Sequence, residues 1–383
     1  MSLQQLTMGV EEEFFLVSAD GRLAESSPEF ADTPTTHGGF SAELRQCQVE
    51  AVTGVCRTTE QLLGQLTGLR RELAGLVGKH GLRLLASGSP VLRELEPAEI
   101  TPTPRYLRIA EQFGDMVRSV PTCGCHVHVG IPDRETGVRV INQLRPWLPV
   151  LLAVSANSPF NGADTGYASW RYQEWSRWPS AGPPPLVSGA DEYESIVDDM
   201  LRCGAVIDTA MVYWDIRLSQ SHPTVEFRIS DVAARPEHAA LIATLIRGLV
   251  ADALDATTPP SDQPQAVLRA NIWRASRDGL NARTLHPVTG ELTPIDSQLV
   301  DLVERLRPAL GVDHDFVAAG LARLRALGDG AARQRATYRR RHALTDVVDD
   351  LTVHPHEHAD RGLHHRLRSA QVIPEMPVIP RAS

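Results

Sequence analysis

Lysine is nearly absent from this 383-residue chain, in which Lys79 is the only lysine and arginine supplies the other basic side chains. A conventional phosphate-binding loop needs the pattern Gly-x-x-x-x-Gly-Lys-Ser/Thr, and this pattern does not occur. The net charge of −9 is the opposite of the positive charge that is typical of proteins that bind nucleic acids, so it argues against a nucleic-acid-binding protein. Nucleotide binding through a P-loop lysine is therefore excluded.

Long apolar runs and a disulfide framework are also missing. The longest apolar run, residues 147–156, is interrupted by Pro149 and is too short to span a bilayer. The N-terminus lacks the basic-then-apolar layout of a signal peptide, and five irregularly spaced cysteines do not make a disulfide framework in a chain this long. We expect a soluble cytoplasmic protein with no nucleic acid and no membrane among its partners. A homo-oligomer is compatible with the sequence, which does not decide the oligomeric state.

What is present is enough apolar surface for a large core. Hydrophobic residues make up 42% of the chain, and its length alone would allow roughly two or three domains. Thr58 and Gln61 fit a capping box, and the following leucines recur at spacings of three and four, which predicts a helix ending near residues 78–81. Further predicted elements are a short strand at 82–86 and helices at 105–118 and 237–258.

The segment 8–17, Met-Gly-Val-Glu-Glu-Glu-Phe-Phe-Leu-Val, is the most informative part of the chain. In a β-strand, Glu11 and Glu13 project from one face, and Val10 and Glu12 project from the other. Two carboxylates held this close raise each other's pKa unless a cation lies between them. The pattern therefore indicates a site for divalent metal ions, although a solvated edge strand is the competing interpretation.

The segment 123–132, Cys-Gly-Cys-His-Val-His-Val-Gly-Ile-Pro, is the second chemical signal. As a strand it places His126 and His128 on one face, whereas Cys125 points to the other. A zinc site that used both cysteines and both histidines is opposed by this alternation. A redox Cys-x-Cys pair and a purely structural role for the histidines remain as alternatives.

A third strand is predicted at 223–231, Pro-Thr-Val-Glu-Phe-Arg-Ile-Ser-Asp, with residues 213–218 as its hairpin neighbour. Glu226 and Arg228 lie on its polar face. They fit a plain salt bridge, or equally a metal ligand beside a guanidinium that binds phosphate. Three strands thus each present acidic or histidine side chains on one face, as expected for one antiparallel sheet lined with metal-binding groups.

Between the second and third strands lies a long segment, 155–178, that contains three of the six tryptophans. Loops of this length are commonly functional or disordered, and the aromatic density argues against disorder. Arg171 and Arg177 could hold a substrate carboxylate. A packed Ω-loop with surface arginines is the alternative.

Four of these motifs occur together and in order: Gly9-Val-Glu-Glu-Glu, Cys123-Gly-Cys-His-Val-His-Val, Ser158-Pro-Phe with Asp164-Thr-Gly-Tyr-Ala-Ser-Trp-Arg, and Glu226-Phe-Arg-Ile-Ser-Asp. In combination they resemble the motifs of the ATP-dependent carboxylate–amine ligases, the type 2 glutamate–cysteine ligase family. The resemblance covers roughly residues 7 to 350. One departure is Asn161, which stands directly after Ser-Pro-Phe where the family usually has an aromatic residue soon afterwards.

The resemblance implies the fold of the glutamine-synthetase-like superfamily, which also includes guanidino kinases. This is an α+β fold in which a curved antiparallel β-sheet forms a funnel with helices packed outside. It implies one catalytic domain over 1–350, followed by a polar C-terminal tail over 351–383. ATP and Mg²⁺ or Mn²⁺ are the implied cofactors. The histidines of the tail are expected to be solvated rather than to form a site.

The same resemblance assigns roles to single residues. Glu11 and Glu13 match the first acidic metal ligands, and Glu43 and Glu50 match the next, with Glu50 also given a catalytic role. Because Glu43 and Glu50 are seven residues apart, they cannot share one face of a regular strand, so a bulge or turn must intervene. Further matches are His126 and Glu226 as metal ligands, His128 in cofactor binding, Arg228 at the transferred phosphate, and Arg171 in substrate binding.

The implied partners are small-molecule amino acid and amine substrates. The implied reaction joins a carboxylate, expected to be the γ-carboxylate of glutamate, to an amine through an acyl phosphate formed from ATP. Weak glutamate–cysteine ligase activity is expected, and His128 is the candidate for the base that deprotonates the amine. A metal-dependent phosphotransferase or hydrolase could use the same acidic groups. A non-catalytic nucleotide-binding relative is the third hypothesis.

Overall fold

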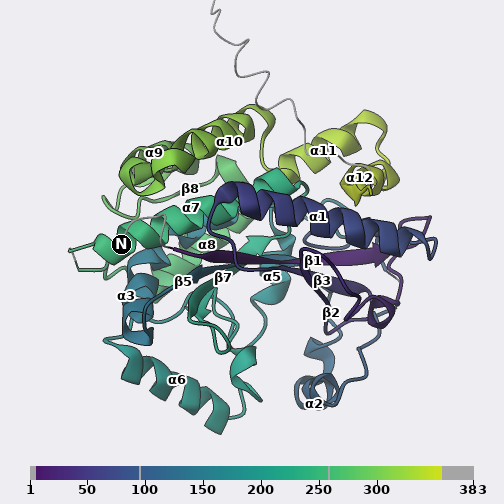
Figure 1. Ribbon diagram of the computed structural model, residues 1–383, viewed down its shortest axis with the longest axis horizontal. Coiled ribbons are helices and arrows are strands. Elements are labelled where there is room, and N and C mark those ends of the chain that lie inside the picture. Colours follow the sequence, from purple (N-terminus) through teal and green to yellow (C-terminus); the bar gives the residue numbers. More distant parts are fainter. Residues whose placement is uncertain (1–5, 95, 258, 356–383) are drawn as a thin grey trace, which may run out of the picture.

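The computed structural model describes residues 6–94, 96–257 and 259–355, and Figure 1 shows a sheet seen edge-on with helices on both sides. The sheet has the order β10-β4-β1-β5-β7-β6, with β3 added to β1 and β2 added to β3. Every pairing between its strands is antiparallel. The strands are β1 Met8–Val17, β2 Gly38–Ala42, β3 Gln48–Thr53, β4 Arg83–Leu85, β5 Gly124–Gly130, β6 Ile216–Leu218, β7 Thr224–Asp231 and β10 Thr352–Val353.

β1 is the central strand of the sheet. One of its edges pairs with β5 and then with β4, and its other edge pairs with β3. This pairing on both edges satisfies the backbone of a strand that carries three consecutive acids. The side chains alternate as predicted, because Glu12 meets Arg70 of helix α1 (Thr59–Gly78), whereas Glu11 and Glu13 line a cavity on the opposite face.

One face of the sheet is covered by two layers of helices, which lie above the sheet in Figure 1. The inner layer contains α1 and α7 (Pro236–Asp255), which pack on each other, and the outer layer contains α9 (Ile295–Leu310) and α10 (His314–Leu327). The predicted capping box of α1 is confirmed, since Thr58 Oγ1 accepts a hydrogen bond from the Gln61 backbone N–H at 3.1 Å. The leucine stripe of α1 packs into the core, as its periodicity predicted.

The other face of the sheet carries the cavity and the segment 155–178. Part of this segment forms α5 (Trp170–Trp175), and the rest is tied to β7 through the buried Asp231. The Asp231 carboxylate accepts hydrogen bonds from the Asn157 N–H at 2.8 Å and from the hydroxyls of Ser158 and Ser169, each at 2.7 Å. The segment is therefore a packed part of the fold.

The remaining elements frame these two faces. Helices α2 (Pro104–Phe113) and α6 (Ala190–Arg202) lie on the cavity side, below the sheet in Figure 1. The predicted helix at 105–118 ends earlier than expected because Gly114 adopts a φ of 53°, which breaks the helical path. The other elements are α3 Arg134–Leu144, α4 Leu148–Ser155, α8 Gln265–Asp278, α11 Gly330–Arg341, α12 Leu344–Leu351, β8 Arg283–Leu285 and β9 Leu292–Pro294.

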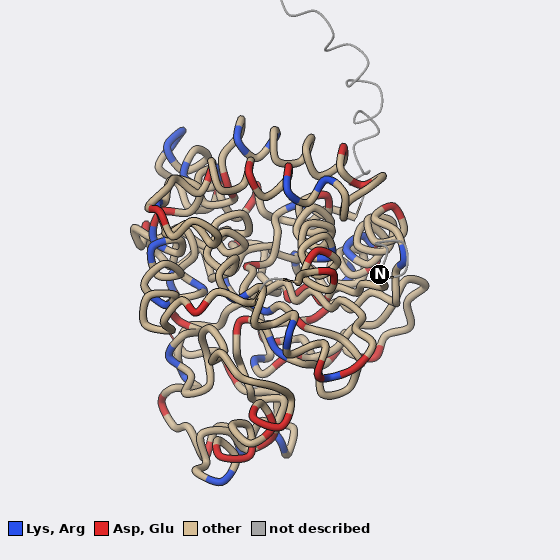
Figure 2. The backbone as a smooth tube through the Cα atoms, turned by 90° about the vertical axis from the view of Figure 1, so that its left-hand side faces the viewer, with Lys and Arg blue, Asp and Glu red and all other residues tan. Residues whose placement is uncertain are grey.

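Two features bear on partners and boundaries. In the view of Figure 2, basic and acidic positions are interspersed over the molecule, and within the described ranges no helix is long and apolar enough to cross a membrane. Strand β10 pairs with β4, so the sheet includes two residues of the predicted tail. The tail histidines from residue 356 onward lie outside the described residues.

Candidate active site

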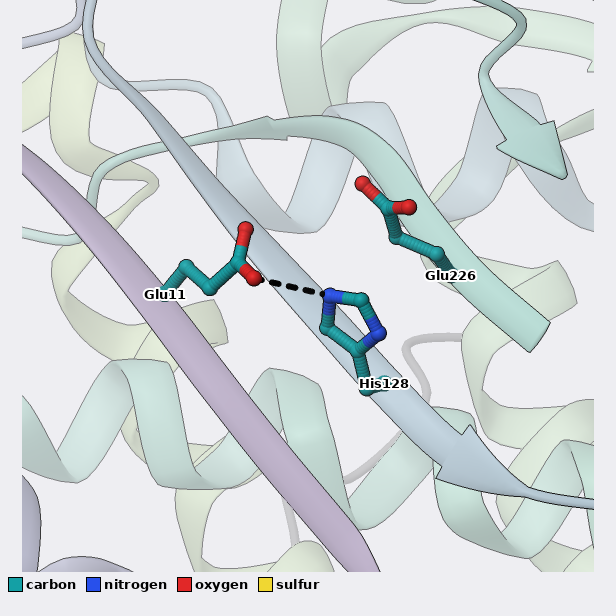
Figure 3. A group of neighbouring side chains, drawn as sticks. All are labelled: Glu11, His128 and Glu226. Atoms are coloured by element: carbon teal, nitrogen blue, oxygen red, sulfur yellow. Dashed lines mark ion pairs between the residues drawn. The ribbon is translucent and has the colours of Figure 1, made fainter. Parts of the chain in front are cut away.

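The cross-strand register brings the predicted ligands of three strands together. Glu11 of β1 lies opposite His126 of β5, and His128 of β5 lies opposite Glu226 of β7. Cross-strand partners share a face of the sheet. The Glu11 carboxylate accordingly lies between the two imidazoles, with Oε2 at 3.1 Å from His126 Nδ1 and Oε1 at 3.1 Å from His128 Nε2. Figure 3 shows Glu11, His128 and Glu226 converging from neighbouring strands.

Oxygen and nitrogen donors form three overlapping groups on this face. Within each group the donor atoms lie within 4.8 Å of one another. Carboxylate oxygens suit Mg²⁺ or Mn²⁺, and each group contains at most one imidazole, so the mainly carboxylate donor set fits the predicted metals. Glu11 and Glu50 each belong to two groups. The groups are Glu11–His128–Glu226, Glu11–Glu50–His126 and Glu13–Glu43–Glu50.

Glu43 and Glu50 reach the same place from different elements. Strand β2 ends at Ala42 and β3 begins at Gln48, so the predicted interruption between the two acids is a turn. Glu50 then lies opposite Glu13 across the β1–β3 pair. Its carboxylate also accepts a hydrogen bond from the Ser41 hydroxyl at 2.8 Å.

Glu11, Glu50, Glu13 and Glu43 form an acidic row along this face. The pKa values at its two ends are shifted in opposite directions. Burial raises the pKa of Glu11, but hydrogen bonds from His126 and His128 outweigh it and hold that pKa well below its usual value. Burial and the neighbouring Glu13 raise the pKa of Glu43 to about 8. Burial and the charge of Glu43 raise the pKa of Glu50 well above its usual value. At the end formed by Glu13, Glu43 and Glu50, the crowded carboxylates thus oppose one another's ionisation, and a bound cation would favour their ionised forms.

Glu226 lies in a cluster of arginines. Burial raises its pKa, but the charges of Arg228 and Arg217 outweigh that effect and lower the pKa to about 2. Arg217 binds the Glu226 carboxylate through two hydrogen bonds, at 2.7 and 3.1 Å, and Arg228 donates to the same carboxylate. The salt bridge considered for Glu226 and Arg228 is therefore present, and it leaves Glu226 ionised beside His128.

A β-bulge places Arg228. Between β5 and β7, two residues of β7, Arg228 and Ile229, lie opposite the single residue His126. A bulge withdraws backbone groups from the ladder and redirects side chains. The buried guanidinium of Arg171 donates to the released carbonyls of Arg228 at 3.1 Å and Ile229 at 3.3 Å. Arg171 is 2% exposed and does not line the cavity, so its role in substrate binding stays a prediction.

Gly124 makes this arrangement possible. A Cβ atom at residue 124 would overlap the guanidinium of Arg171, so only glycine leaves room for it. The Gly124 N–H in turn donates to Glu13 Oε2 at 2.5 Å. One glycine thus connects the support of Arg228 with the orientation of an acidic ligand.

The cavity in front of the acids has an aromatic wall. Trp175 and Trp178 of the predicted tryptophan-rich segment pack on Tyr213, with ring centroids 4.6 and 5.6 Å away, and Tyr106 lies nearby. The sequence interpretation missed Arg45, Arg105, Tyr106 and Arg217 as lining residues. Only Arg217 had a local signal, because it alternates with the buried Ile216 and Leu218 in β6.

A second cavity lies on the other side of Glu11. It shares Glu11 with the first cavity and has His128 and His222 in its wall, with ring centroids 6.1 Å apart. Its other lining residues are mainly small or apolar, and they include Leu6, Gly9, Val52, Val55, Ile131 and Pro132. The acidic row therefore separates a charged, aromatic cavity from a more apolar one.

Cys123 and Cys125 have free thiols buried beside this site. Burial raises the pKa of both thiols well above the usual value, so neither is poised to be a thiolate ligand. Neither belongs to the three ligand groups of the described residues.

Comparisons with known proteins show what this chain is similar to. The model of the family described as Glutamate-cysteine ligase family 2 matches residues 7–360. A protein of Rhodococcus jostii named "Putative glutamate–cysteine ligase 2-1" is 48% identical over 357 residues, covering 91% of this chain and 96% of its own. A protein of the same name from Saccharopolyspora erythraea is 44% identical over 352 residues, covering 91% and 94%.

Two solved structures share the fold at low sequence identity. Glutamate–cysteine ligase from Francisella tularensis, in complex with AMP, has a TM-score of 0.62 at 12% identity, covering 90% of this chain and 87% of its own. The ligase PafA, in complex with the prokaryotic ubiquitin-like protein Pup, has a TM-score of 0.53 at 12% identity, covering 96% and 77%. The predicted fold class is thereby confirmed.

Proposed function

Because the chain belongs to glutamate–cysteine ligase family 2, we propose that this ligase joins the γ-carboxylate of glutamate to an amine, with ATP as the activating substrate. The family and its relatives support a carboxylate–amine ligase of this type. The nucleotide, the metal ions and the acyl phosphate are our proposal, and so is the glutamate. The names of the relatives give cysteine as the amine, and we leave open which amine this chain uses.

The chemistry requires two displacements. A carboxylate is a poor electrophile, so its oxygen first attacks the γ-phosphorus of ATP, and ADP leaves. The product is an acyl phosphate. The nitrogen of the amine then attacks the carbonyl carbon, phosphate leaves with the electron pair of the broken C–O bond, and the nitrogen loses a proton.

The residues on the sheet face suit the first step. Mg²⁺ or Mn²⁺ held by the acidic groups would offset the charge of the phosphates and of the attacking carboxylate. Arg228 presents a buried guanidinium beside Glu226, where it can stabilise the charge on the transferred phosphoryl group. Removing such a donor typically costs on the order of 3 kcal/mol in activation free energy.

The two cavities suggest which substrate enters from which side. The more apolar cavity around His128 and His222 has the character of a site for a nucleotide base, and it opens onto the Glu11–His128–Glu226 group. The cavity with the arginines and tryptophans opens onto Glu13, Glu43 and Glu50. We assign the first to ATP and the second to the acid and the amine.

One observation carries the proposal: Glu11 and Glu50 link three ligand groups into a continuous row between the two cavities. A row of this kind can hold metal ions on both sides of a transferred phosphoryl group. An isolated structural metal site would need a single closed group of ligands.

The test is ADP release with Mg²⁺ and ATP, measured against a matrix of amino acids paired with amines that includes cysteine. We expect release that requires both an acid and an amine, with the amide detected by mass spectrometry. Glu11→Gln and Arg228→Ala should both abolish it, whereas Glu194→Gln, on the exposed surface of α6, should not. ADP release without an amide would instead favour a phosphotransferase or hydrolase. ATP binding without turnover would favour a non-catalytic nucleotide-binding protein.

A further inference from the structure

The arginines of the charged cavity are not equivalent. Four of them line it, and three are paired with carboxylates: Arg105 with Asp208, and Arg217 and Arg228 with Glu226. The fourth, Arg45, is only 3% exposed. Within residues 6–94, 96–257 and 259–355, the Arg45 guanidinium forms no ion pair with a carboxylate.

Two backbone carbonyls hold the Arg45 side chain in place. Its Nη1 donates to the Ala98 carbonyl at 2.5 Å, and its Nη2 donates to the Ser119 carbonyl at 3.1 Å. These neutral acceptors fix the orientation of the guanidinium, and the charge of Glu25 acts on it without a direct ion pair. A guanidinium has five N–H donors, so three remain for another partner. A buried, oriented and unpaired cation in a cavity wall is suited to bind an anion without rearrangement.

The position of Arg45 relates this anion site to the acidic row. Arg45 lies in the turn between β2 and β3, two residues after Glu43, and both residues line the same cavity. A substrate carboxylate that reacts beside Glu13, Glu43 and Glu50 therefore has Arg45 within the same wall. Only a substrate with a second carboxylate can use both places.

We infer that Arg45 is a specificity-determining residue that binds the non-reacting carboxylate of an amino dicarboxylic acid. This inference rests on the proposed ligase function, which it deepens by separating the carboxylate that reacts from the one that is recognised. It also assigns substrate binding to Arg45, which lies inside the cavity, instead of Arg171. Arg171 supports the backbone behind Arg228.

A purely structural role for Arg45 makes a different prediction. The hydrogen bonds from the Arg45 side chain to the Ala98 and Ser119 carbonyls also tie the turn between β2 and β3 to the segments on both sides of α2. Loss of those contacts alone would weaken the binding of every acid substrate equally. Loss of a carboxylate site would weaken only those substrates that carry the second carboxylate.

The experiment compares L-glutamate with 4-aminobutanoate, which is glutamate without its α-carboxylate. Using ADP release with a fixed amine, kcat/KM is measured for both acids in the wild type, in Arg45→Met and in Arg45→Lys. We expect the wild type to prefer glutamate and Arg45→Met to lose roughly 10- to 100-fold in kcat/KM for glutamate only. Arg45→Lys keeps the charge and should retain part of the preference. Arg118→Met, which removes a nearby exposed arginine, should leave the preference intact.

Equal losses for both acids in Arg45→Met, or no loss for either, would overturn the inference. So would a wild type that does not distinguish the two acids. Calorimetric binding of each acid, with Mg²⁺ and a non-hydrolysable ATP analogue, separates this result from failure of the proposed function. Selective glutamate binding that requires Arg45, without any ADP release, would keep the carboxylate site and refute the ligase proposal. Absence of binding by either acid would refute the site itself.

Discussion

The carboxylate of Glu12 binds the guanidinium of Arg70 through two hydrogen bonds, at 2.8 and 2.5 Å, on the helix-covered face of β1. Glu12 is 1% exposed and Arg70 is 3% exposed. Arg70 also donates to the Ala233 carbonyl at 2.7 Å and so ties α1 to the end of β7. The middle acid of Glu-Glu-Glu is thus a core residue, whereas its two neighbours face the cavity.

This pair predicts a large effect of Arg70→Met on stability. The substitution leaves the Glu12 carboxylate buried without its partner, and breaking a buried ion pair in this way typically costs about 3–5 kcal/mol. We expect a loss of that order in the free energy of unfolding, measured by urea denaturation. Arg134→Met breaks the exposed pair with Glu194 and should cost about 1 kcal/mol or less. Similar losses in both variants would show that the buried Glu12–Arg70 pair contributes no more to the free energy of unfolding than an exposed pair.

The contact between Arg171 and Gly124 predicts a coupled effect on catalysis. Arg171→Lys cannot bind both carbonyls of the bulge, and Gly124→Ala would displace the guanidinium. Because Arg228 then shifts, we expect kcat to fall by roughly 100-fold in each single variant. The double variant should lose little more than either alone, since both changes break one contact.

Arg177→Lys is the matched control, because Arg177 lies in the same segment but its side chain is 54% exposed. We expect nearly normal kcat for it. Additive losses in the Arg171/Gly124 double variant would contradict a shared role in placing Arg228.

The assignment of the two cavities predicts opposite effects on substrate affinity. His222→Ala opens the wall of the apolar cavity, so it should raise the KM for ATP and leave the KM for the acid nearly unchanged. Trp175→Ala removes part of the aromatic wall of the other cavity, so it should raise the KM for the acid or the amine but not for ATP. Steady-state kinetics with each substrate varied in turn provide the measurement. The reverse pattern would exchange the two assignments.

His238 of α7 predicts a pH dependence of stability away from the site. Burial, followed by the charge of Arg333, lowers its pKa to about 3, and the other charges that act on it, Arg70 and Arg323, are also positive. Between the unfolded pKa near 6.5 and this folded pKa, the unfolded chain binds a proton that the folded chain does not. The free energy of unfolding should therefore fall as the pH drops below about 6.5, by roughly 2 kcal/mol at pH 5.

His238→Gln should remove this contribution, so its stability should depend less on pH between 5 and 7 in thermal unfolding. His80→Gln, at a half-exposed histidine, should keep the pH dependence of the wild type. An unchanged dependence in His238→Gln would assign it to other groups.

Much of the local structure could be predicted from the sequence. The capping box and leucine stripe of α1, the hairpin of β6 and β7, and the face shared by Glu11 and Glu13 all depend on residues close in the chain. Such patterns reflect helix and strand geometry, which acts over a few residues. The same alternation in three strands predicted one sheet lined with acids and histidines, and the family resemblance then assigned Glu11, His126 and Glu226 as metal ligands.

Other parts of the site depend on contacts between distant residues. Arg45 reaches Ala98 and Ser119, Arg70 finds Glu12, and Arg171 reaches the carbonyls of the bulge in β7. The sequence does not identify the partners of these arginines, because each partner lies many residues away in the chain. The contacts of the Arg171 side chain with backbone carbonyls depend on the register of β5 and β7. Those of the Arg45 side chain depend on how the turn after β2 packs.

The sequence by itself thus determined which elements form and which of their faces carry acids and histidines, because backbone geometry sets those periodicities. Tertiary structure alone decided which charges are paired and which remain free to meet a ligand. The physical reason is that a buried charge is balanced by whatever lies within a few ångströms in space. For Glu12 that partner comes from α1, and for Arg45 the carboxylate remains to be supplied by a substrate.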